Sequence, residues 1–558
     1  MAAFDRTTAL AELADGPPFD VVVVGGGITG AGCALDAASR GLRTALIERH
    51  DFASGTSSKS SKLVHGGLRY LQQREVRLVY EALLERQRLR HNAAHLVRDL
   101  PFLIPILTRD GLLDRRVARA LGGAMWAYDL TGGLRIGKLH ERISAQEAME
   151  YLPTLRADRL HSAYLYHDCE ADDARLTLAV ARTAAEHYAA VVANGVSLVG
   201  LDKGPDGRVQ GCRLRTTEGD EFGVGARVVV NATGVWTDSV RALDDGVDPH
   251  AIRPAKGVHI TFPRALVGAS IAAVLPVPRD RRSVFLVPHG DLAYVGTTDT
   301  EYDGPLDDPE CTPDDLDYLL RAVRSATTAE LSPADVVGTW AGLRPLVRSA
   351  ETERTADLSR RHHLTASDSG VLTITGGKLT TYRRMAADTI DHAARILHDR
   401  DRRLVPRGCQ TRKLPLIGAD DLEGTRSDLG RSRHLSRAAA DHLVGRYGGE
   451  AGAVSAIVDE RPALAAPLVE GLPYLAAEAV YSVRHEMARS LADVLDRRTR
   501  ARILDLPATH AAVPRVAELL GAELGWGPHQ THTAVADYRS ELDHERRAAG
   551  LSSPVASS

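Results

Sequence analysis

The chain has 558 residues, of which 44% are hydrophobic and 25% are charged, and its formal net charge is −4. This length exceeds what a single hydrophobic core supports, so two or three domains are expected, and the near balance of charge gives no general reason to bind nucleic acid. The five cysteines include no C-x-x-C pair, which argues against a disulfide framework or a thiolate zinc site and fits a reducing compartment.

The N-terminal segment, residues 1–16, lacks a basic stretch followed by an apolar run, so no signal peptide is expected. The longest aliphatic run near it, Val21 to Val24, is far shorter than the ~20 residues that a membrane span requires. We therefore expect a cytoplasmic protein, and a peripheral position on the inner face of the cytoplasmic membrane stays open.

The first part of the chain predicts a βαβ unit. Residues 20–24 are predicted as a buried strand, residues 31–40 as a helix rich in small residues, and residues 44–48 as a second strand. Residues 74–98 are helical by pattern, and residues 226–231 predict another strand. The alternating segments VFLVPHG and LAYVGTT are typical of strands. This order predicts a nucleotide-binding sheet assembled from distant pieces and interleaved with a sheet-based substrate domain.

Between the first strand and the helix stands GGGITG, a G-x-G-x-x-G motif. Gly25 permits a tight turn, Gly27 lets the backbone approach a pyrophosphate, and Gly30 allows close packing of the helix on the strand. The positive helix N-terminus then faces the phosphates. Glu48 ends the second strand, where a carboxylate accepts hydrogen bonds from ribose hydroxyls. Strand, glycines, helix and acid together predict a dinucleotide site.

Two later segments favour FAD over a nicotinamide cofactor. The strand that ends in residues 231–234 suits a second backbone contact with the cofactor. Gly376-Gly377-Lys378 opens a helix over residues 380–397, and the N-terminus of that helix is expected to face the flavin ring. A nicotinamide cofactor would not need contacts from such distant segments, so the sequence predicts FAD.

An acidic cluster of Asp168, Asp172 and Asp173 raises the question of a metal site. No histidine stands at ligand spacing and there is no D-x-D-x-D-G loop, so no metal is predicted. Asp172 and Asp173 are instead expected to cap a helix that begins at Ala174.

Residues 112–138 combine arginines and a lysine with apolar and aromatic residues such as Met125 and Trp126. This mixture suits a segment that lies in a lipid interface, with its arginines on anionic headgroups. An amphipathic helix that packs one face on the core and exposes the other to solvent is an equal alternative.

The sequence pattern changes after residue 400, where the oxidoreductase-like part ends. Residues 401–434, rich in Arg, Gly and Asp, are predicted as a linker. A helical pattern follows over residues 435–545, and residues 546–558 are predicted as a disordered tail.

Several sequence blocks resemble the FAD-dependent, aerobic-type glycerol-3-phosphate dehydrogenase family. The block Ser57 to Leu71 is especially diagnostic, because glycine and sarcosine oxidases share the superfamily fold but lack it. The segment HEMARSLADVLDRRTR resembles the family's C-terminal domain. The other blocks are VVVVGGGITGAGCALDAASRGL, SGTSSKSSKLVHGGLRYL, DCEADDARL, VVNATGVWTDSV, RPAKGVHI, VGTTDTEYDG, GLRPLV and ITGGKLTTYR.

The resemblance implies an α/β fold with an FAD-binding Rossmann-like sheet of the D-amino-acid-oxidase/glucose-oxidase type, a mixed-sheet substrate domain and an all-helical C-terminal domain. The oxidoreductase region is expected over residues 18–400, with a discontinuous FAD-binding domain at 18–100, 160–245 and 340–400. The resemblance also implies oxidation of sn-glycerol 3-phosphate to dihydroxyacetone phosphate by hydride transfer to flavin N5, with electrons passed to a membrane quinone. A homodimer and an anionic membrane surface as partner stay open.

A phosphate of charge near −2 needs fixed cations, and the arginine guanidinium grips phosphate oxygens through two parallel hydrogen bonds. Arg282 and Arg360 each have an arginine neighbour, Arg281 or Arg361, as an alternative. By motif, the expected substrate-binding residues are Arg69, Tyr70, Arg282, Arg344, Arg360 and Lys378.

Oxidation of a secondary alcohol needs a base that takes the hydroxyl proton while the hydride leaves. His259, on the alternating segment HITF, is the first candidate, because histidine titrates near neutral pH. His65 is the second, although its Ser/Lys/Gly loop suits cofactor contact better. Lys378 and Arg344 are expected to complete the catalytic set.

The same carry-over by motif gives the expected cofactor contacts. They are Gly25, Gly27, Gly30, Glu48, Thr56, Ser57, Lys62, Leu63, His65, Gly66, Val196, Gly234, Trp236, Gly377, Lys378, Leu379 and Thr380.

Rival functions differ in the electron acceptor or in the substrate. An oxygen-reducing glycerol-3-phosphate oxidase would share the pocket and form peroxide. An amine oxidase of the same superfamily would need a carboxylate-binding pocket, whereas repeated arginines suit a dianion better. A non-catalytic flavin-binding protein would bind FAD without reduction by any polyol phosphate.

Overall fold

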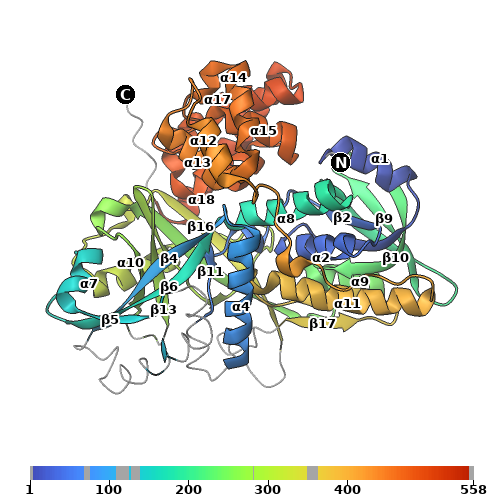
Figure 1. Ribbon diagram of the computed structural model, residues 1–558, viewed down its shortest axis with the longest axis horizontal. Coiled ribbons are helices and arrows are strands. Elements are labelled where there is room, and N and C mark those ends of the chain that lie inside the picture. Colours follow the sequence, from blue (N-terminus) through green and yellow to red (C-terminus); the bar gives the residue numbers. More distant parts are fainter. Residues whose placement is uncertain are drawn as a thin grey trace.

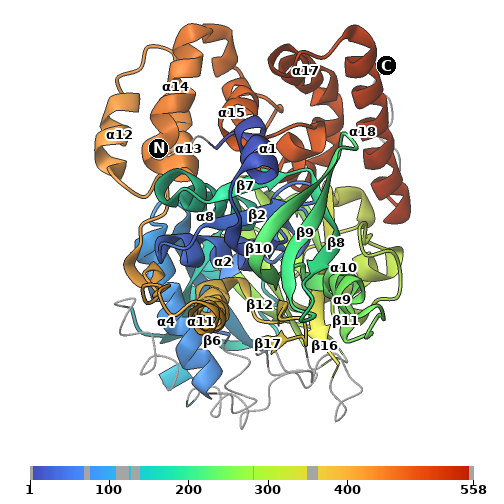
Figure 2. The same cartoon turned by 90° about the vertical axis from the view of Figure 1, so that its right-hand side faces the viewer.

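The computed structural model describes residues 4–67, 76–107, 123, 125–126, 138–278, 280, 282–348 and 362–551. Two β-sheets lie beside each other, and a helical C-terminal domain covers their upper side (Figure 1). The view turned by 90° shows the same helical domain above both halves (Figure 2). Arg69, Tyr70 and Arg360 lie outside the described residues, as does most of segment 112–138.

Among the described residues, eight strands form the first sheet, in the order β17-β18-β10-β1-β2-β7, with β9 paired to β10 and β8 to β9. Parallel strands covered on both faces are continuously apolar, which accounts for the valine run of β1. The strands are β1 (Phe19–Val24), β2 (Thr44–Glu48), β7 (Val191–Asn194), β8 (Val196–Lys203), β9 (Val209–Thr216), β10 (Glu221–Asn231), β17 (His363–Ala366) and β18 (Leu372–Thr375).

Helices cover this sheet and join the cofactor motifs to it. Helix α2 (Ile28–Ser39) packs against α8 (Asp173–Tyr188) and α11 (Tyr382–Arg400). A methyl group at Gly32 of α2 would lie 2.7 Å from the ring of Tyr382, so a small residue is needed at this crossing. Helices α1 (Arg6–Asp15) and α9 (Thr237–Asp245) complete this half.

In the described ranges, ten strands form the second sheet, in the order β15-β11-β14-β13-β12-β4-β6-β3, with β16 paired to β11 and β5 to β6. Helices α4 (Val76–Asn92), α7 (Ala145–Tyr151) and α10 (Pro313–Ala326) accompany it. The strands are β3 (Leu63–Val64), β4 (Val97–Leu107), β5 (Glu141–Ser144), β6 (Leu160–Ala171), β11 (Ile252–Pro263), β12 (Ala272–Pro276), β13 (Ser283–His289), β14 (Leu292–Gly296), β15 (Thr300–Glu301) and β16 (Gly338–Val347).

The C-terminal domain shares a hydrophobic core with the second sheet. Trp340 of β16 belongs to the same buried cluster as Tyr447 and Leu504. Thr261 donates to the carbonyl of Ile503 at 2.7 Å. The domain comprises α12 (Leu422–Leu429), α13 (Arg437–Tyr447), α14 (Ala451–Glu460), α15 (Ala476–Glu486), the π-helical turn η11 (Asp493–Arg498), α16 (Ala501–Leu504), α17 (Leu506–Leu524) and α18 (Pro528–Ala548).

The structure differs from the sequence-based boundaries at four places. Residues 160–171 and 340–347, assigned to the FAD-binding domain, lie in β6 and β16 of the second sheet. Helix α12 lies inside the predicted linker and packs on α13 and α14, and α18 continues to Ala548 inside the predicted tail. Hydrophobic alternation shows that a strand is half-buried but not which sheet it joins, so the first two boundaries were wrong.

None of the described helices is both long enough and apolar enough to cross a lipid bilayer.

Candidate functional site

A pocket lies at the carboxyl ends of β1 and β2, beside the N-terminus of α2. In parallel sheets, ligands bind at this end of the strands. Many of the residues predicted to bind the cofactor line this pocket: Gly25, Gly27, Glu48, Thr56, Ser57, Val196, Gly234, Trp236, Gly377, Lys378 and Leu379. These residues come from six separate segments of the chain, which the first sheet and β16 bring together.

The glycine motif is packed too tightly for side chains at two of its positions. Gly25 has φ +109°, a conformation that side chains disfavour. A methyl group at Gly30 would lie 1.9 Å from the carbonyl oxygen of Gly25. The N-terminus of α2 therefore abuts the end of β1, with Gly27 and Ile28 exposed to the pocket. Backbone N–H groups at a helix N-terminus favour an anion there.

Glu48 is buried, and its two carboxylate oxygens each accept a backbone hydrogen bond. Oε2 accepts from the N–H of Gly26 at 2.7 Å, and Oε1 accepts from that of His50 at 2.9 Å. Burial raises the pKa of Glu48, although the two backbone donors act in the opposite direction. Because a carboxylate oxygen has two lone pairs, the side chain retains capacity to accept from a ligand hydroxyl.

The loop of residues 56–62 joins the pocket to the second sheet. Its first turn is the 3-10 helix η1 (Thr56–Ser58). Ser57 Oγ accepts from the N–H of Ile28 at 2.9 Å, at the start of α2. Thr56 donates to the carbonyl of Leu343 in β16 at 2.6 Å. One loop thus contacts both the glycine motif and the strand that carries Arg344.

His259 lies in β11 with only 2% of its surface exposed. Its ring stacks on Trp340 at 4.5 Å with an interplanar angle of 5°, and Nε2 lies 2.8 Å from Ser61 Oγ. Gly296 makes room for the ring, because a methyl group there would lie 2.0 Å from Cδ2. In the described part of the chain, Nδ1 has no hydrogen-bond partner. Burial, and then Lys62 and Arg344, hold the pKa of His259 well below 6.5, so the ring is neutral.

Arg344 and Arg282 meet at Asp299. Arg344 Nη1 lies 3.2 Å from Asp299 Oδ1, and its Nη2 donates to Thr297 Oγ1 and to the carbonyl of Thr298. Arg282 donates to the carbonyl of Asp299 at 2.6 Å and pairs with Asp280 at 2.9 Å. These contacts place Arg344 at the carboxylate of Asp299 and Arg282 at the backbone carbonyl of the same residue, and Arg344 acts on the buried imidazole of His259.

Several predicted residues stand beside the pocket and do not line it. Among them, His65 donates its N–H to Thr380 Oγ1 at 3.2 Å, just after the second glycine-rich segment, and Gly66 donates its N–H to Asp168 Oδ1 of β6 at 3.3 Å. The predicted residues of this kind are Gly30, Lys62, Leu63, His65, Gly66, Thr380, His259, Arg282 and Arg344.

The acidic cluster has separate structural partners. Asp172 caps α8, where its side chain accepts from the N–H of Arg175 at 3.1 Å. Asp173 was wrongly assigned to the cap; α8 begins at Asp173, and its carboxylate accepts from Ser60 instead. Asp168 pairs with Arg86. No group of three or more metal-binding side chains occurs among the residues for which the structure gives positions.

Sequence reasoning missed other lining residues. Arg49 lines the pocket and places its guanidinium 4.6 Å from the ring centre of Trp236. Ser197 and Pro345 are direct neighbours of Val196 and Arg344, so adjacency to predicted residues is the signal that could have found them.

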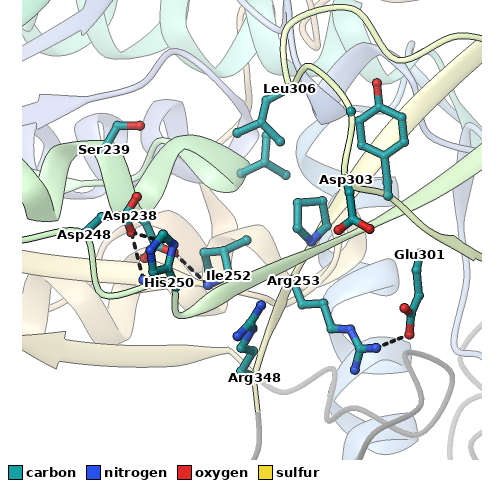
Figure 3. Close-up of a pocket in the computed structure, with 14 residues that line it drawn as sticks. Asp238, Ser239, Asp248, His250, Ile252, Arg253, Glu301, Asp303, Leu306 and Arg348 are labelled. Atoms are coloured by element: carbon teal, nitrogen blue, oxygen red, sulfur yellow. Dashed lines mark hydrogen bonds and ion pairs between the residues drawn. The ribbon is translucent and has the colours of Figure 1, made fainter.

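A second pocket lies at the start of β11, where Asp238, His250, Arg253, Glu301 and Arg348 gather (Figure 3). Arg253 is paired with Glu301. The charges that line this second pocket are of both signs, and it lacks the glycine motif of the first pocket, so the first pocket is the better cofactor site.

The first pocket fits FAD. The N-terminus of α2 suits the pyrophosphate, and Glu48 suits a ribose. Gly376 and Gly377 both have positive φ, and a methyl group at Gly377 would lie 2.2 Å from the sulfur of Met385. The backbone therefore forms the pocket wall directly before η7 (Leu379–Thr381) and α11.

Comparison with known families gives two adjacent matches. A family described as FAD dependent oxidoreductase matches residues 20–383. One described as the C-terminal domain of alpha-glycerophosphate oxidase matches residues 409–531.

Curated relatives match nearly the whole chain. A glycerol-3-phosphate dehydrogenase of Mycobacterium leprae is 41% identical over 534 residues, which cover 94% of this chain and 88% of the relative. The mitochondrial glycerol-3-phosphate dehydrogenase of Homo sapiens is 38% identical and matches 97% of this chain and 75% of its own length. The crystal structure of a glycerol-3-phosphate dehydrogenase from Bacillus halodurans with FAD has a TM-score of 0.76 at 28% identity and covers 98% of both chains.

Proposed function

We propose that this chain, which belongs to the family of FAD-dependent glycerol-3-phosphate dehydrogenases, oxidises sn-glycerol 3-phosphate to dihydroxyacetone phosphate. The observation that carries the proposal is a buried, neutral histidine close to paired arginines, beside a pocket that fits FAD. A dianionic alcohol needs both features, because one group must hold the phosphate and another must take the hydroxyl proton.

Arg344 and Arg282 are the phosphate ligands in this proposal. Their planar donors suit bidentate contact with phosphate oxygens. Pro345, the residue after Arg344, lines the pocket, so the strand that carries this guanidinium borders the cofactor site. Arg69, Tyr70 and Arg360 are expected to complete the phosphate site.

His259 is the proposed base. Its neutral ring accepts a proton. Its Nδ1 is buried and has no hydrogen-bond partner among the described residues, so a ligand can supply one. A bound phosphate of charge near −2 opposes the effect of Lys62 and Arg344 and stabilises the imidazolium that forms. FAD, when bound, supplies the acceptor for the hydride that leaves C2. Ser61, at 2.8 Å from Nε2, holds the ring in place.

Lys378 places positive charge at the pocket wall. It lines the pocket and stands directly before η7, which continues into α11. The helix N-terminus and the ammonium group together favour negative charge that develops nearby during the reaction.

The electron acceptor separates this proposal from its closest rival, an oxygen-reducing oxidase. We expect purified holoenzyme with glycerol 3-phosphate to reduce a soluble quinone analogue under nitrogen, and to form peroxide in air at no more than a few per cent of that rate. Equal or faster peroxide formation would identify an oxidase and leave the substrate assignment intact. Membrane association through residues 112–138 belongs to the same proposal, because a membrane quinone requires contact with the bilayer.

A further inference from the structure

Arg500 reaches from the C-terminal domain into the loop of residues 56–62. It stands directly before α16, has φ +68° and is 3% exposed. Its guanidinium donates to the carbonyl of Ser58 and lies 3.1 Å from Asp173 Oδ1. A buried arginine in a left-handed conformation persists only where its surroundings determine it strongly.

Asp173 extends this contact along the loop. Its carboxylate is fully buried and its Oδ2 accepts from the N–H and the hydroxyl of Ser60, at 3.0 and 2.7 Å. The carbonyl of Ser60 in turn accepts from the indole of Trp340 at 3.3 Å. Arg500 and Asp173 therefore fix the backbone of two loop residues, Ser58 and Ser60.

These two residues lie between the two functional ends of the loop. Ser57 precedes them and accepts from the start of α2, at the pocket. Ser61 follows them and contacts His259. Lys62, at the end of the loop, has φ +58°, so this path of the backbone needs external support. A shift of the loop would move the pocket wall and the histidine together.

We propose that Arg500 is a positioning residue through which the helical C-terminal domain fixes this loop, and with it the cofactor pocket and the orientation of His259. The effect on His259 rests on the proposed function, whereas the effect on the pocket does not. The C-terminal domain then contributes to the flavin site without lining it.

The test compares Arg500→Lys with Arg502→Lys in full-length holoenzyme. Lysine keeps the charge at position 500, but its side chain is one bond shorter, so its nitrogen cannot occupy the position of Arg500 Nη2, which reaches both Ser58 and Asp173. Arg502 is a matched control, because it lies in α16, is largely buried and pairs with Glu545 at 2.7 Å and Asp496 at 3.0 Å. Within the described residues, none of its hydrogen bonds or ion pairs reaches the loop, and lysine preserves the charge that acts on Lys59 through space. The readouts are the visible circular dichroism of bound FAD and its dissociation rate, followed by kcat and KM.

We expect Arg500→Lys to alter the flavin circular dichroism, to release FAD about tenfold faster and to lower kcat more than it raises KM, with Arg502→Lys close to wild type. Wild-type flavin spectrum and FAD release in Arg500→Lys would overturn the proposal. If Arg500→Lys does not fold, Asp173→Asn takes its place and the same measurements and criteria apply to it. The flavin readouts need no substrate, so a failure of the proposed reaction would not obscure them.

Discussion

Replacement of His259 by glutamine is expected to lower kcat by about 100- to 10,000-fold and to leave FAD binding intact. Glutamine can keep the contact with Ser61, which lies 2.8 Å from the ring, but it cannot take a proton at neutral pH. KM should change little, because the arginines still hold the phosphate. Steady-state kinetics with a quinone analogue, together with the flavin spectrum of the purified variant, measure both quantities.

The pH dependence gives an independent check on His259. A pKa held below 6.5 means that the base form is present throughout the neutral range and is lost only as the pH falls further. The acid limb of kcat/KM reports both the free enzyme and the substrate, whose phosphate titrates at about pH 6. It should therefore lie below pH 6.5, and in His259→Gln it should keep only the step that belongs to the substrate. If His259→Gln has wild-type kcat, or if its acid limb is unchanged, another group takes the hydroxyl proton of the substrate.

Replacement of Arg344 by lysine is expected to lower kcat/KM for glycerol 3-phosphate by about 100- to 1,000-fold, since two charge-assisted hydrogen bonds are lost. The loss should be mainly in KM, because the phosphate is held both in the ground state and in the transition state. Lysine retains a cation beside Asp299, so the buried carboxylate keeps an ion partner.

Arg253→Lys provides the matched control for Arg344→Lys. Arg253 lies on β11, the strand paired with β16, and forms a comparable ion pair with Glu301 in the second pocket. Its kinetics should remain within about twofold of wild type. Equal losses in both variants, or an unchanged KM in Arg344→Lys, would show that Arg344 does not recognise phosphate.

The N-terminal βαβ unit was predictable because local sequence determines it. Residues 20–24 and 44–48 were expected as strands and form β1 and β2. The D-amino-acid-oxidase-type fold with mixed sheets and a helical C-terminal domain was also confirmed. The sheet to which β6 and β16 belong was not predictable, because strand pairing is decided by contacts between distant segments.

The sequence proposes candidate site residues one at a time and gives no arrangement for them. Motifs single out His259 and Arg344 individually, but nothing in their spacing indicates that Trp340 stacks on the imidazole or that both arginines meet at Asp299. Arg500 ends the block HEMARSLADVLDRRTR, but the block does not indicate its contacts, because its partners Ser58 and Asp173 lie far away in the chain. Such contacts follow from the packing of whole domains.

An anaerobic titration of the yellow holoenzyme with glycerol 3-phosphate tests directly whether this alcohol reduces the bound flavin. We expect about one equivalent of substrate to bleach the flavin absorbance and to yield dihydroxyacetone phosphate, whereas glycerol and glycine should leave the spectrum unchanged. Flavin that stays oxidised in excess glycerol 3-phosphate, or that is bleached equally by an amino acid, would contradict it.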